Sequence, residues 1–425
     1  MTERSVNMDA DSSSYWQRNL AICLLGSFAT VFAMTVVLPF LPIYVEQLGV
    51  KGHAAIVQWS GIAYGANFLA AGLIAPLWGH LGDRFGRKPM LIRASLGMAL
   101  TIPLMGFASN IWQFVGLRFL AGIAGGYASG ATILIAVQTP KHRVGWALGL
   151  LASGVMAGNL LGPLAGGSLP SLIGIRATFW AAGAMIFIAF VATALFVREV
   201  TVKAEVASEA RSGGWSQVPH KGVVMAMLAT GLLLMIANMS IEPIITVYVA
   251  TLVKGPLVLH AGGARNSGHV TFVAGLVMAA TALGSIASAS QLGKVADRAG
   301  HSKVIILALM AAGVLLVPQA FVTSAWQLIV LRFLMGLALG GLLPCIAAVI
   351  RHNVPDHFVG AALGYSLSSQ FAGQVTGPLI GGFVGGQIGL KAVFFGTSLL
   401  LLIGAAFNWK AVGFSARDQA SLLST

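Results

Sequence analysis

The chain has 425 residues, of which 57% are hydrophobic and only 9% are charged. This composition excludes a soluble globular protein and indicates a polytopic membrane protein. The formal net charge of +13 would otherwise suggest a nucleic-acid partner. However, 18 of the 25 Lys and Arg residues fall on the side predicted to be cytoplasmic, as membrane topology requires, so we predict no nucleic-acid partner.

Twelve apolar runs are bounded by charged residues or by Gly, Pro and Asn turns, and each is long enough to cross a bilayer as a helix. The predicted spans are 19–45, 56–81, 90–108, 111–136, 145–170, 177–197, 222–250, 269–292, 304–322, 325–350, 359–386 and 391–411. We expect an all-α polytopic membrane protein in which the polar linker 198–221 joins two six-helix bundles, 19–197 and 222–411. The segments 1–18 and 412–425 are predicted to be cytoplasmic tails, because the first span is too long to be a cleaved signal peptide.

The two halves of the chain repeat each other in sequence. IWQFVGLRFLAG around Arg118 returns as AWQLIVLRFLMG around Arg332, 214 residues later (332 − 118). The run at 145–167 returns at 360–382 with an offset of 215. Such a repeat predicts 12 transmembrane helices in two pseudo-symmetric six-helix bundles, with a pathway between them.

The loop between the second and third spans carries a charged motif, GHLGDRFGRK, from Gly79 to Lys88. A weaker copy, GKVADRAGHSK, runs from Gly293 to Lys303. Charges enter lipid only at high cost, so both motifs are predicted to be tight turns at the cytoplasmic surface. The residues that we single out in them are Gly79, Asp83, Arg84, Gly86, Arg87, Asp297 and Arg298. A solvated turn that only fixes the topology is the alternative.

Glycines recur at every fourth residue of the fifth span, at Gly154, Gly158, Gly162 and Gly166. They form one bare stripe, which lets helices touch closely. Pro163, beside the stripe, is expected to kink the helix. The alternative is the ordinary small-residue packing of a membrane bundle, since the eleventh span carries similar glycines around Gly377.

Few polar side chains are available to line a pathway, and a mostly apolar cavity favours amphiphilic substrates. The candidates for the substrate cavity are Tyr64, Asn67, Tyr127, Asn238, Gln370 and Gln374. For each of them, the alternative is a hydrogen bond between helices. The histidines and cysteines form no metal-ligand or nucleophile pattern, so we expect no metal site and no catalytic residue.

These motifs together resemble the major facilitator superfamily, and within it the drug:proton antiporters with twelve spans. GHLGDRFGRK resembles the family's loop motif after the second helix, and LRFLAG around Arg118 resembles its fourth-helix motif. GNLLGPLAGG at 158–167 resembles its antiporter motif, and PFLP at 39–42 resembles its first-helix proline motif. Within the family, the run PFLPIYVEQLGV most resembles one group of multidrug resistance transporters.

The resemblance implies a latch on the cytoplasmic side. Asp83 would sit at the start of the eleventh helix, near Val359, where the helix dipole is positive. With Arg84 and Arg87 it would hold the halves closed on the inside, and Asp297 with Arg298 would act more weakly against the fifth helix.

The resemblance also implies a seal on the outer side and a cavity lined by helices 1, 4, 7 and 10. The seal would be a close contact of the fifth helix with the eighth, made by Gly158, Gly162, Pro163, Gly166 and Gly167. The sequence departs from many drug antiporters because its first helix has no carboxylate before Glu46.

Glu242 is predicted to lie deep within the seventh span, about 29 Å along it at 1.5 Å per residue. Arg118 and Arg332 lie six residues past Trp112 and Trp326, which puts all three charges at a similar depth. A carboxylate that alternates between a protonated form and an ion pair with an arginine can carry a proton. We predict that Glu242 carries the coupled proton with Arg118 and Arg332 beside it. A fixed structural Glu–Arg pair and a hydrated, uninvolved carboxylate are the alternatives.

The predicted function is secondary active transport, namely proton-coupled efflux of drugs or other amphiphilic molecules by alternating access. The chain has no P-loop sequence, so a proton gradient rather than a cofactor is the expected energy source. A proton-coupled importer of a small metabolite is the alternative, because a fold does not set the direction of transport. The expected partners are a small-molecule substrate, protons and the lipid of the bacterial inner (plasma) membrane, with both termini cytoplasmic and the protein monomeric.

Overall fold

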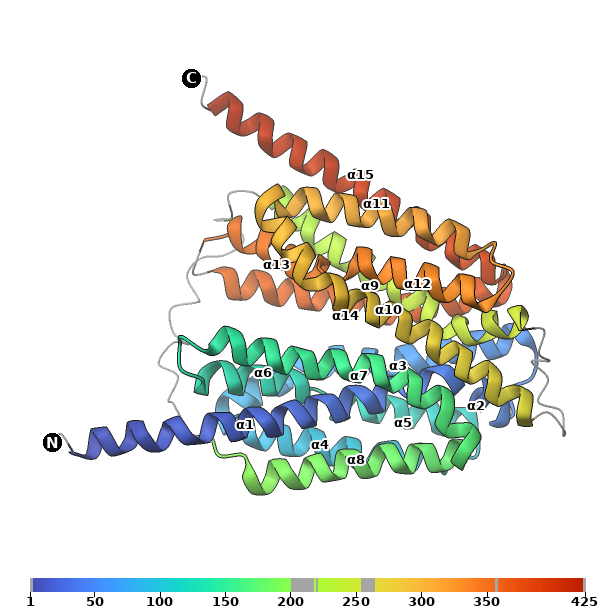
Figure 1. The fold of residues 1–425 in the computed structure, drawn as a ribbon, viewed down its shortest axis with the longest axis horizontal. Helices are drawn as coiled ribbons and strands as arrows, with labels where there is room; N and C mark the ends of the chain where they lie inside the picture. The colour runs from blue at the N-terminus through green and yellow to red at the C-terminus, as the bar shows by residue number, and fades with distance from the viewer. Residues whose placement is uncertain (1–2, 200–217, 219–220, 254–263, 356–357, 423–425) are drawn as a thin grey trace. The chain divides into compact units, whose positions relative to one another are not determined.

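The computed structural model describes residues 3–199, 218, 221–253, 264–355 and 358–422. Side chains are described for residues 15–199, 218, 221–253, 268–355 and 358–410. Every regular element in these ranges is a helix (Figure 1). Most of the predicted linker 198–221 lies outside the described residues.

Each predicted span coincides with one helix or with consecutive helices, but the first and last helices extend into the predicted tails: the first begins 16 residues before 19 (19 − 3), and the last ends 11 residues after 411 (422 − 411). In the first half of the sequence the helices are α1 (Glu3–Thr35), η1 (Leu38–Phe40), α2 (Leu41–Gln47), α3 (His53–Phe85), α4 (Arg87–Met105), α5 (Ile111–Ala124), α6 (Tyr127–Gln138), α7 (Val144–Ile173) and α8 (Ile175–Phe196). In the second half they are α9 (Lys221–Leu252), α10 (Ala264–Ala299), α11 (His301–Gln319), α12 (Ala325–Leu339), α13 (Leu342–His352), α14 (Val359–Gln387) and α15 (Leu390–Leu422).

Ten spans in the described part of the chain are long and apolar enough to cross a membrane. The other two predicted spans are the helices α4 and α14. Their lower hydropathy has a visible cause in the sequence: α4 carries Arg87, Lys88 and Arg93, and α14 is rich in Gly, Ser and Gln. The predicted all-α membrane fold is confirmed.

Three predicted spans are broken rather than continuous. The first breaks around Pro39 and Pro42, which remove two backbone donors within one turn. The fourth breaks at Gly126, whose φ of 104° is open mainly to glycine, and the tenth breaks at Gly340 and Gly341. The single Pro243 interrupts nothing, because α9 runs through it as one helix.

Arg93 holds the break in the fourth span. Its guanidinium donates to the carbonyl oxygens of Ile123 (3.0 Å) and Gly125 (2.9 Å), which the break leaves without helix partners. It also lies over the Trp78 ring, 3.7 Å from the centroid, and Trp78 Nε1 donates to the same Ile123 oxygen (2.8 Å). A half-buried arginine needs polar partners, and here carbonyl oxygens and an aromatic face supply them.

The chain forms two compact units. Unit 1 contains Met1–Val50, Ala66–Lys203 and Val258–Ala279, and unit 2 contains Lys51–Gly65, Ala204–Leu257 and Ala280–Thr425. The units therefore differ from the two sequence halves in two segments. The first part of α3 packs in unit 2, and the first part of α10 packs in unit 1.

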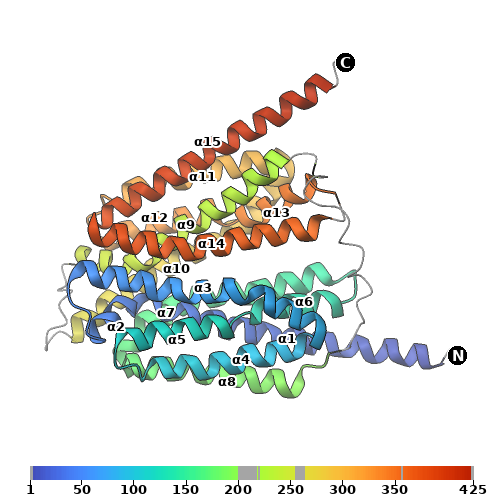
Figure 2. The same ribbon diagram turned by 180° about the vertical axis from the view of Figure 1, so that it is seen from behind.

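In unit 1 the glycine stripe of α7 packs directly on α1, which lies alongside it (Figures 1 and 2). A Cβ added at Gly158 would lie 3.0 Å from Phe28 O and from Phe32 N, and one at Gly166 would overlap Val36 O. The two backbones therefore touch where a side chain would keep them apart.

Unit 2 repeats this packing between α14 and α9. A Cβ at Gly373 would lie 2.6 Å from Leu232 O, and one at Gly381 would overlap Ser240 O. A second contact is also repeated: Tyr44 donates to Met105 O (2.5 Å) in unit 1, and Tyr248 donates to Gln319 O (2.7 Å) in unit 2. Residues that match in the sequence repeat therefore make matching contacts in the two units.

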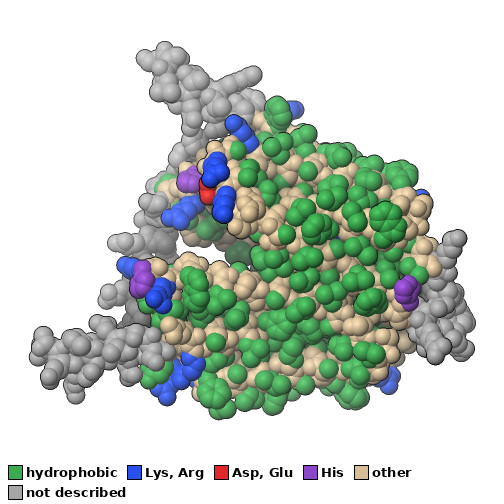
Figure 3. Space-filling view, viewed as in Figure 1, with side chains coloured by type: hydrophobic (Ala, Val, Ile, Leu, Met, Phe, Trp, Pro, Cys, Tyr) green, Lys and Arg blue, Asp and Glu red, His purple; other side chains and the backbone are tan. Residues whose placement is uncertain are grey.

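Large apolar side chains stay exposed on both units, among them Leu73 (69%), Trp112 (71%) and Leu307 (65%). Figure 3 shows hydrophobic side chains over the middle of the face that it draws, and Lys, Arg and His side chains toward its edges. Soluble proteins rarely expose apolar patches of this extent. The surface suits lipid.

Candidate functional site

A buried ion pair joins two helices of unit 2. Arg332 of α12 and Glu242 of α9 lie with Nη2 and Oε1 3.6 Å apart, and their side chains are 1% and 19% exposed. Sequence reasoning predicted both residues. The structure brings them together although they are 90 residues apart in the chain (332 − 242).

The pair is not built as a tight structural salt bridge. A distance of 3.6 Å is longer than a charge-assisted hydrogen bond, and Arg332 Nε and Nη2 have no hydrogen-bond partner within the described residues. Burying two charges costs several kcal/mol per ion, which only good geometry and further hydrogen bonds offset. Ionisable residues within membrane spans commonly mark functional sites, so the pair is a candidate functional site.

Arg118, the third residue of the predicted proton site, lies in α5 and is 3% exposed. It is the repeat counterpart of Arg332, but it belongs to unit 1. Its place beside Glu242 stays a prediction.

The charged turn of unit 1 joins α3 to α4. Asp83 forms an ion pair with Arg87 across the turn, and Gly86 between them has a φ of 93°, a conformation that side chains rarely adopt. Asp83 is 70% exposed and Arg87 only 21%. Gly79 lies within α3, six residues before its last residue, so the turn itself depends on Gly86.

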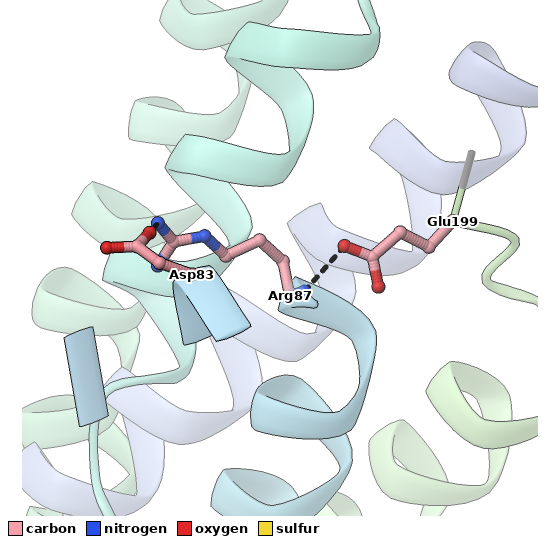
Figure 4. Close-up of polar contacts among 3 residues, drawn as sticks. All are labelled: Asp83, Arg87 and Glu199. Atoms are coloured by element: carbon pink, nitrogen blue, oxygen red, sulfur yellow. Dashed lines mark hydrogen bonds and ion pairs between the residues drawn. The ribbon is translucent and has the colours of Figure 1, made fainter. Parts of the chain in front are cut away.

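Glu199 completes this turn from a distant part of the sequence (Figure 4). Its Oε1 accepts the backbone N–H of Arg87 (2.5 Å), and its Oε2 accepts that of Lys88 (2.9 Å). Sequence reasoning missed Glu199 because a lone acid at the start of a polar linker gives no sign that it folds back onto another helix.

The segment that carries Glu199 is fastened to α1 and α6. Asn19 Nδ2 donates to Arg198 O and to Gln138 Oε1, both at 2.7 Å, and Asn19 Oδ1 accepts from Arg198 N (3.1 Å). Gln138 Nε2 also donates to Arg198 O (3.2 Å). Asn19 is fully buried, so the chain leaves α8 along a fixed path.

The matching turn in unit 2 uses a histidine in place of the arginine. Asp297 lies 3.5 Å from His301 Nε2, and these residues correspond to Asp83 and Arg87 at an offset of 214 (301 − 87). Arg298, like Arg84 in unit 1, is exposed. The predicted partner of Asp83, the start of α14 at Val359, belongs to unit 2, so that contact also stays a prediction.

The antiporter motif contacts two helices. Gly158 and Gly162 face α1, and Gly166 faces Val36 and Pro39 just beyond the end of α1, whereas Gly167 and Pro163 face α10. Thr271 Oγ1 of α10 donates to Gly167 O (2.9 Å), and a Cβ at Gly275 would overlap Pro163 O. The fifth-to-eighth helix contact therefore involves Pro163 and Gly167 rather than the glycine stripe.

The predicted cavity residues divide into two groups. Tyr127 is 1% exposed in the core of unit 1, and its hydroxyl lies 2.7 Å from Thr193 Oγ1. Gln370 Nε2 donates to Ser366 Oγ (3.3 Å), one turn earlier in α14, so this contact lies within one helix. Tyr64 and Asn67 are buried, and Asn238 and Gln374 are half-buried.

A family model described as Major Facilitator Superfamily matches residues 23–264 and 264–419. The multidrug resistance protein MdtG of Salmonella paratyphi B is 41% identical over 399 residues, which cover 93% of this chain and 96% of that protein. MdtG of Salmonella newport matches with the same identity and coverage.

Two solved structures share the fold. The human organic anion transporter MFSD10 (TETRAN) has a TM-score of 0.65 at 18% identity and covers 92% of this chain and 99% of its own. A bacterial homologue of the human lysosomal transporter Spinster, in an inward-facing and unoccupied conformation, has a TM-score of 0.67 at 15% identity, with 94% and 97% covered.

Proposed function

Because the chain belongs to the major facilitator superfamily, we propose that it exports drugs or other amphiphilic small molecules in exchange for protons, by alternating access. The proposal of multidrug export draws on the relatives at 41% identity, which are multidrug resistance proteins of the MdtG type. The family itself makes the protein an integral, multi-pass membrane transporter of small molecules and not an enzyme.

The buried pair of Glu242 and Arg332 carries the proposal of proton coupling. When Glu242 takes up a proton, the ion pair is neutralised on one side and α9 is no longer tied to α12 by charge. When the proton leaves, the pair forms again. Because the strength of this contact depends on one proton, protonation can shift the equilibrium between two arrangements of the same helices. Its loose geometry supports this, since a pair that must open repeatedly gains nothing from saturated hydrogen bonds.

Packing at the starts of α3 and α10 supports alternating access. The first part of α10 contacts α7 within unit 1 through Gly275 and Gly167, and the first part of α3 contacts α14 within unit 2 through Gly61 and Gly382. Both contacts join segments from opposite halves of the sequence. On the predicted topology they would close the outer side, and the Asp83 turn would close the cytoplasmic side.

The proposed setting is the bacterial inner membrane, with both termini in the cytoplasm. The gradient of protons is the proposed energy source. We expect the monomer to be the transporting unit, because the two repeats within one chain supply both halves of the pathway.

The test uses purified protein in proteoliposomes with an imposed pH gradient. Glu242→Gln should abolish uphill drug movement, because the amide takes up no proton, while substrate binding and downhill exchange continue. Glu46→Gln, the same chemical change in α2, is the matched control and should transport normally. Full proton-driven transport by Glu242→Gln would refute the assignment.

A further inference from the structure

We propose that Glu199 is a positioning residue for the Asp83 latch, because its carboxylate fixes the first turn of α4 and so holds the Arg87 side chain beside Asp83. The inference rests on the proposed role of Asp83 in the transport cycle.

The first step is the cap on α4. The first N–H groups of a helix have no partner within the helix, and they lie at the positive end of its dipole. Glu199 accepts two of them, from Arg87 and Lys88, with its two carboxylate oxygens. Arg87 therefore contacts two acids. Its backbone N–H donates to Glu199, and its guanidinium forms an ion pair with Asp83. Figure 4 shows Arg87 between the two acids.

The second step is the fit of the turn to Glu199. A Cβ at Gly86 would lie 2.6 Å from Glu199 Oε2. Two features therefore require a glycine at this position. Its φ of 93° is rare for other residues, and the Glu199 carboxylate occupies the space that a Cβ would need. The turn has no room for a side chain at the place where the Glu199 carboxylate sits.

The third step is the anchoring of Glu199 itself. The preceding residue, Arg198, is held through its backbone N–H and carbonyl by the buried Asn19. Its guanidinium donates to the Tyr15 hydroxyl (2.9 Å). These contacts keep Glu199 beside α4 rather than leaving it on a freely moving linker.

The consequence for Asp83 follows from the cap. Because Glu199 already satisfies the two N–H groups, the carboxylate of Asp83 is not drawn onto them. It accepts from the Arg87 side chain and stays 70% exposed, where a partner can reach it. The repeat offset of 214 from Glu199 falls on Gly413, so the second half of the sequence has no carboxylate at this place. The positioning device belongs to the first half alone.

The test measures the opening of the cytoplasmic side in the full-length protein in lipid. Spin labels at two exposed cytoplasmic positions, Lys141 and Lys303, would report the distance between the units in a background without Cys23 and Cys345. Glu199→Gln should shift the ratio of inward-open to inward-closed protein by up to about five-fold, the limit set by full loss of a helix cap, because the amide keeps one acceptor oxygen for two N–H groups. It should act in the same direction as Asp83→Asn, with drug affinity unchanged, and Glu46→Gln should have no effect.

The double variant Asp83→Asn/Glu199→Gln separates positioning from general destabilisation. If Glu199 acts through Arg87 and Asp83, the double variant shifts the ratio no further than Asp83→Asn alone. Additive shifts would overturn the inference. If Glu199→Gln does not insert into the membrane, Glu199→Asp carries the test, since a shorter side chain withdraws the carboxylate from the same N–H groups.

The remaining outcomes distinguish the two proposals. A shift with Asp83→Asn but none with Glu199→Gln would overturn the role of Glu199 and leave the latch standing. No shift with either variant would overturn the latch, and the role of Glu199 would fall with it.

Discussion

Alanine substitution along α7 should change stability in a graded way, because three glycines of this helix meet different amounts of space. A Cβ at Gly149 would meet no described atom within 4 Å. A Cβ at Gly158 would lie 3.0 Å from three atoms of α1. A Cβ at Gly166 would overlap the Val36 carbonyl oxygen and lie 2.7 Å from its carbon.

The expected changes in the free energy of unfolding differ in sign. Gly149→Ala should stabilise the protein by about 0.5–1 kcal/mol, because alanine loses less backbone entropy than glycine in a helix. Gly158→Ala should be near zero, because small shifts of α1 offset that gain. Gly166→Ala should destabilise by about 1–3 kcal/mol, since a backbone carbonyl cannot rotate away as a side chain can.

The assay is unfolding of the purified protein in mixed micelles by titration with sodium dodecyl sulfate, followed by tryptophan fluorescence. Gly149→Ala is the control, because it makes the same chemical change in the same helix. Equal stability of Gly149→Ala and Gly166→Ala would refute the reasoning, since the contact of α7 with the first span at Val36 would then not depend on the absence of a side chain.

Three further predictions concern the charges. Asp83→Asn should lower transport while drug affinity stays within a few-fold, and loss of binding in correctly inserted protein would contradict a latch. Arg332→Met should destabilise the protein by about 3–5 kcal/mol, because Glu242 is left buried without its partner. The double variant Arg332→Met/Glu242→Gln should recover most of this loss in the same unfolding assay, and no recovery would show that the two residues do not act as a pair. Cysteines at Lys141 and Lys303 should react with a membrane-impermeant maleimide only from the cytoplasmic side, and one at Lys51 only from outside; the reverse pattern would invert the topology.

The sequence alone determined the class of fold, because lipid leaves little choice. A run of about 20 apolar residues in a bilayer must satisfy its backbone hydrogen bonds internally, and a helix is the local way to do so. The repeat was also readable, since matched residues such as Tyr44 and Tyr248 still make matched hydrogen bonds. Glu242 and Arg332 could be singled out because charges inside predicted spans are rare.

The tertiary structure alone decided which partners these residues have. The glycine spacing indicated a bare stripe on the fifth helix, but only packing shows that the stripe faces α1 while Gly167 faces α10. The carbonyl groups that lose their helix partners at the break, those of Ile123 and Gly125, lie close to Gly126 in the sequence. The Arg93 side chain that donates to these carbonyl groups comes from another helix. Such pairings depend on helix rotation, which hydrophobic periodicity cannot fix when lipid and core are equally apolar.

Glu199 shows the same limit most clearly. It lies at the start of the segment 198–221, whose many charged and polar residues are the usual sign of a solvated linker. Its function as a cap arises from the N–H groups of Arg87 and Lys88, 112 and 111 residues away. Any carboxylate close enough can accept hydrogen bonds from the free N–H groups at a helix N-terminus. Which carboxylate lies there depends on the path of the folded chain, which Asn19 fixes here through its hydrogen bonds to Arg198.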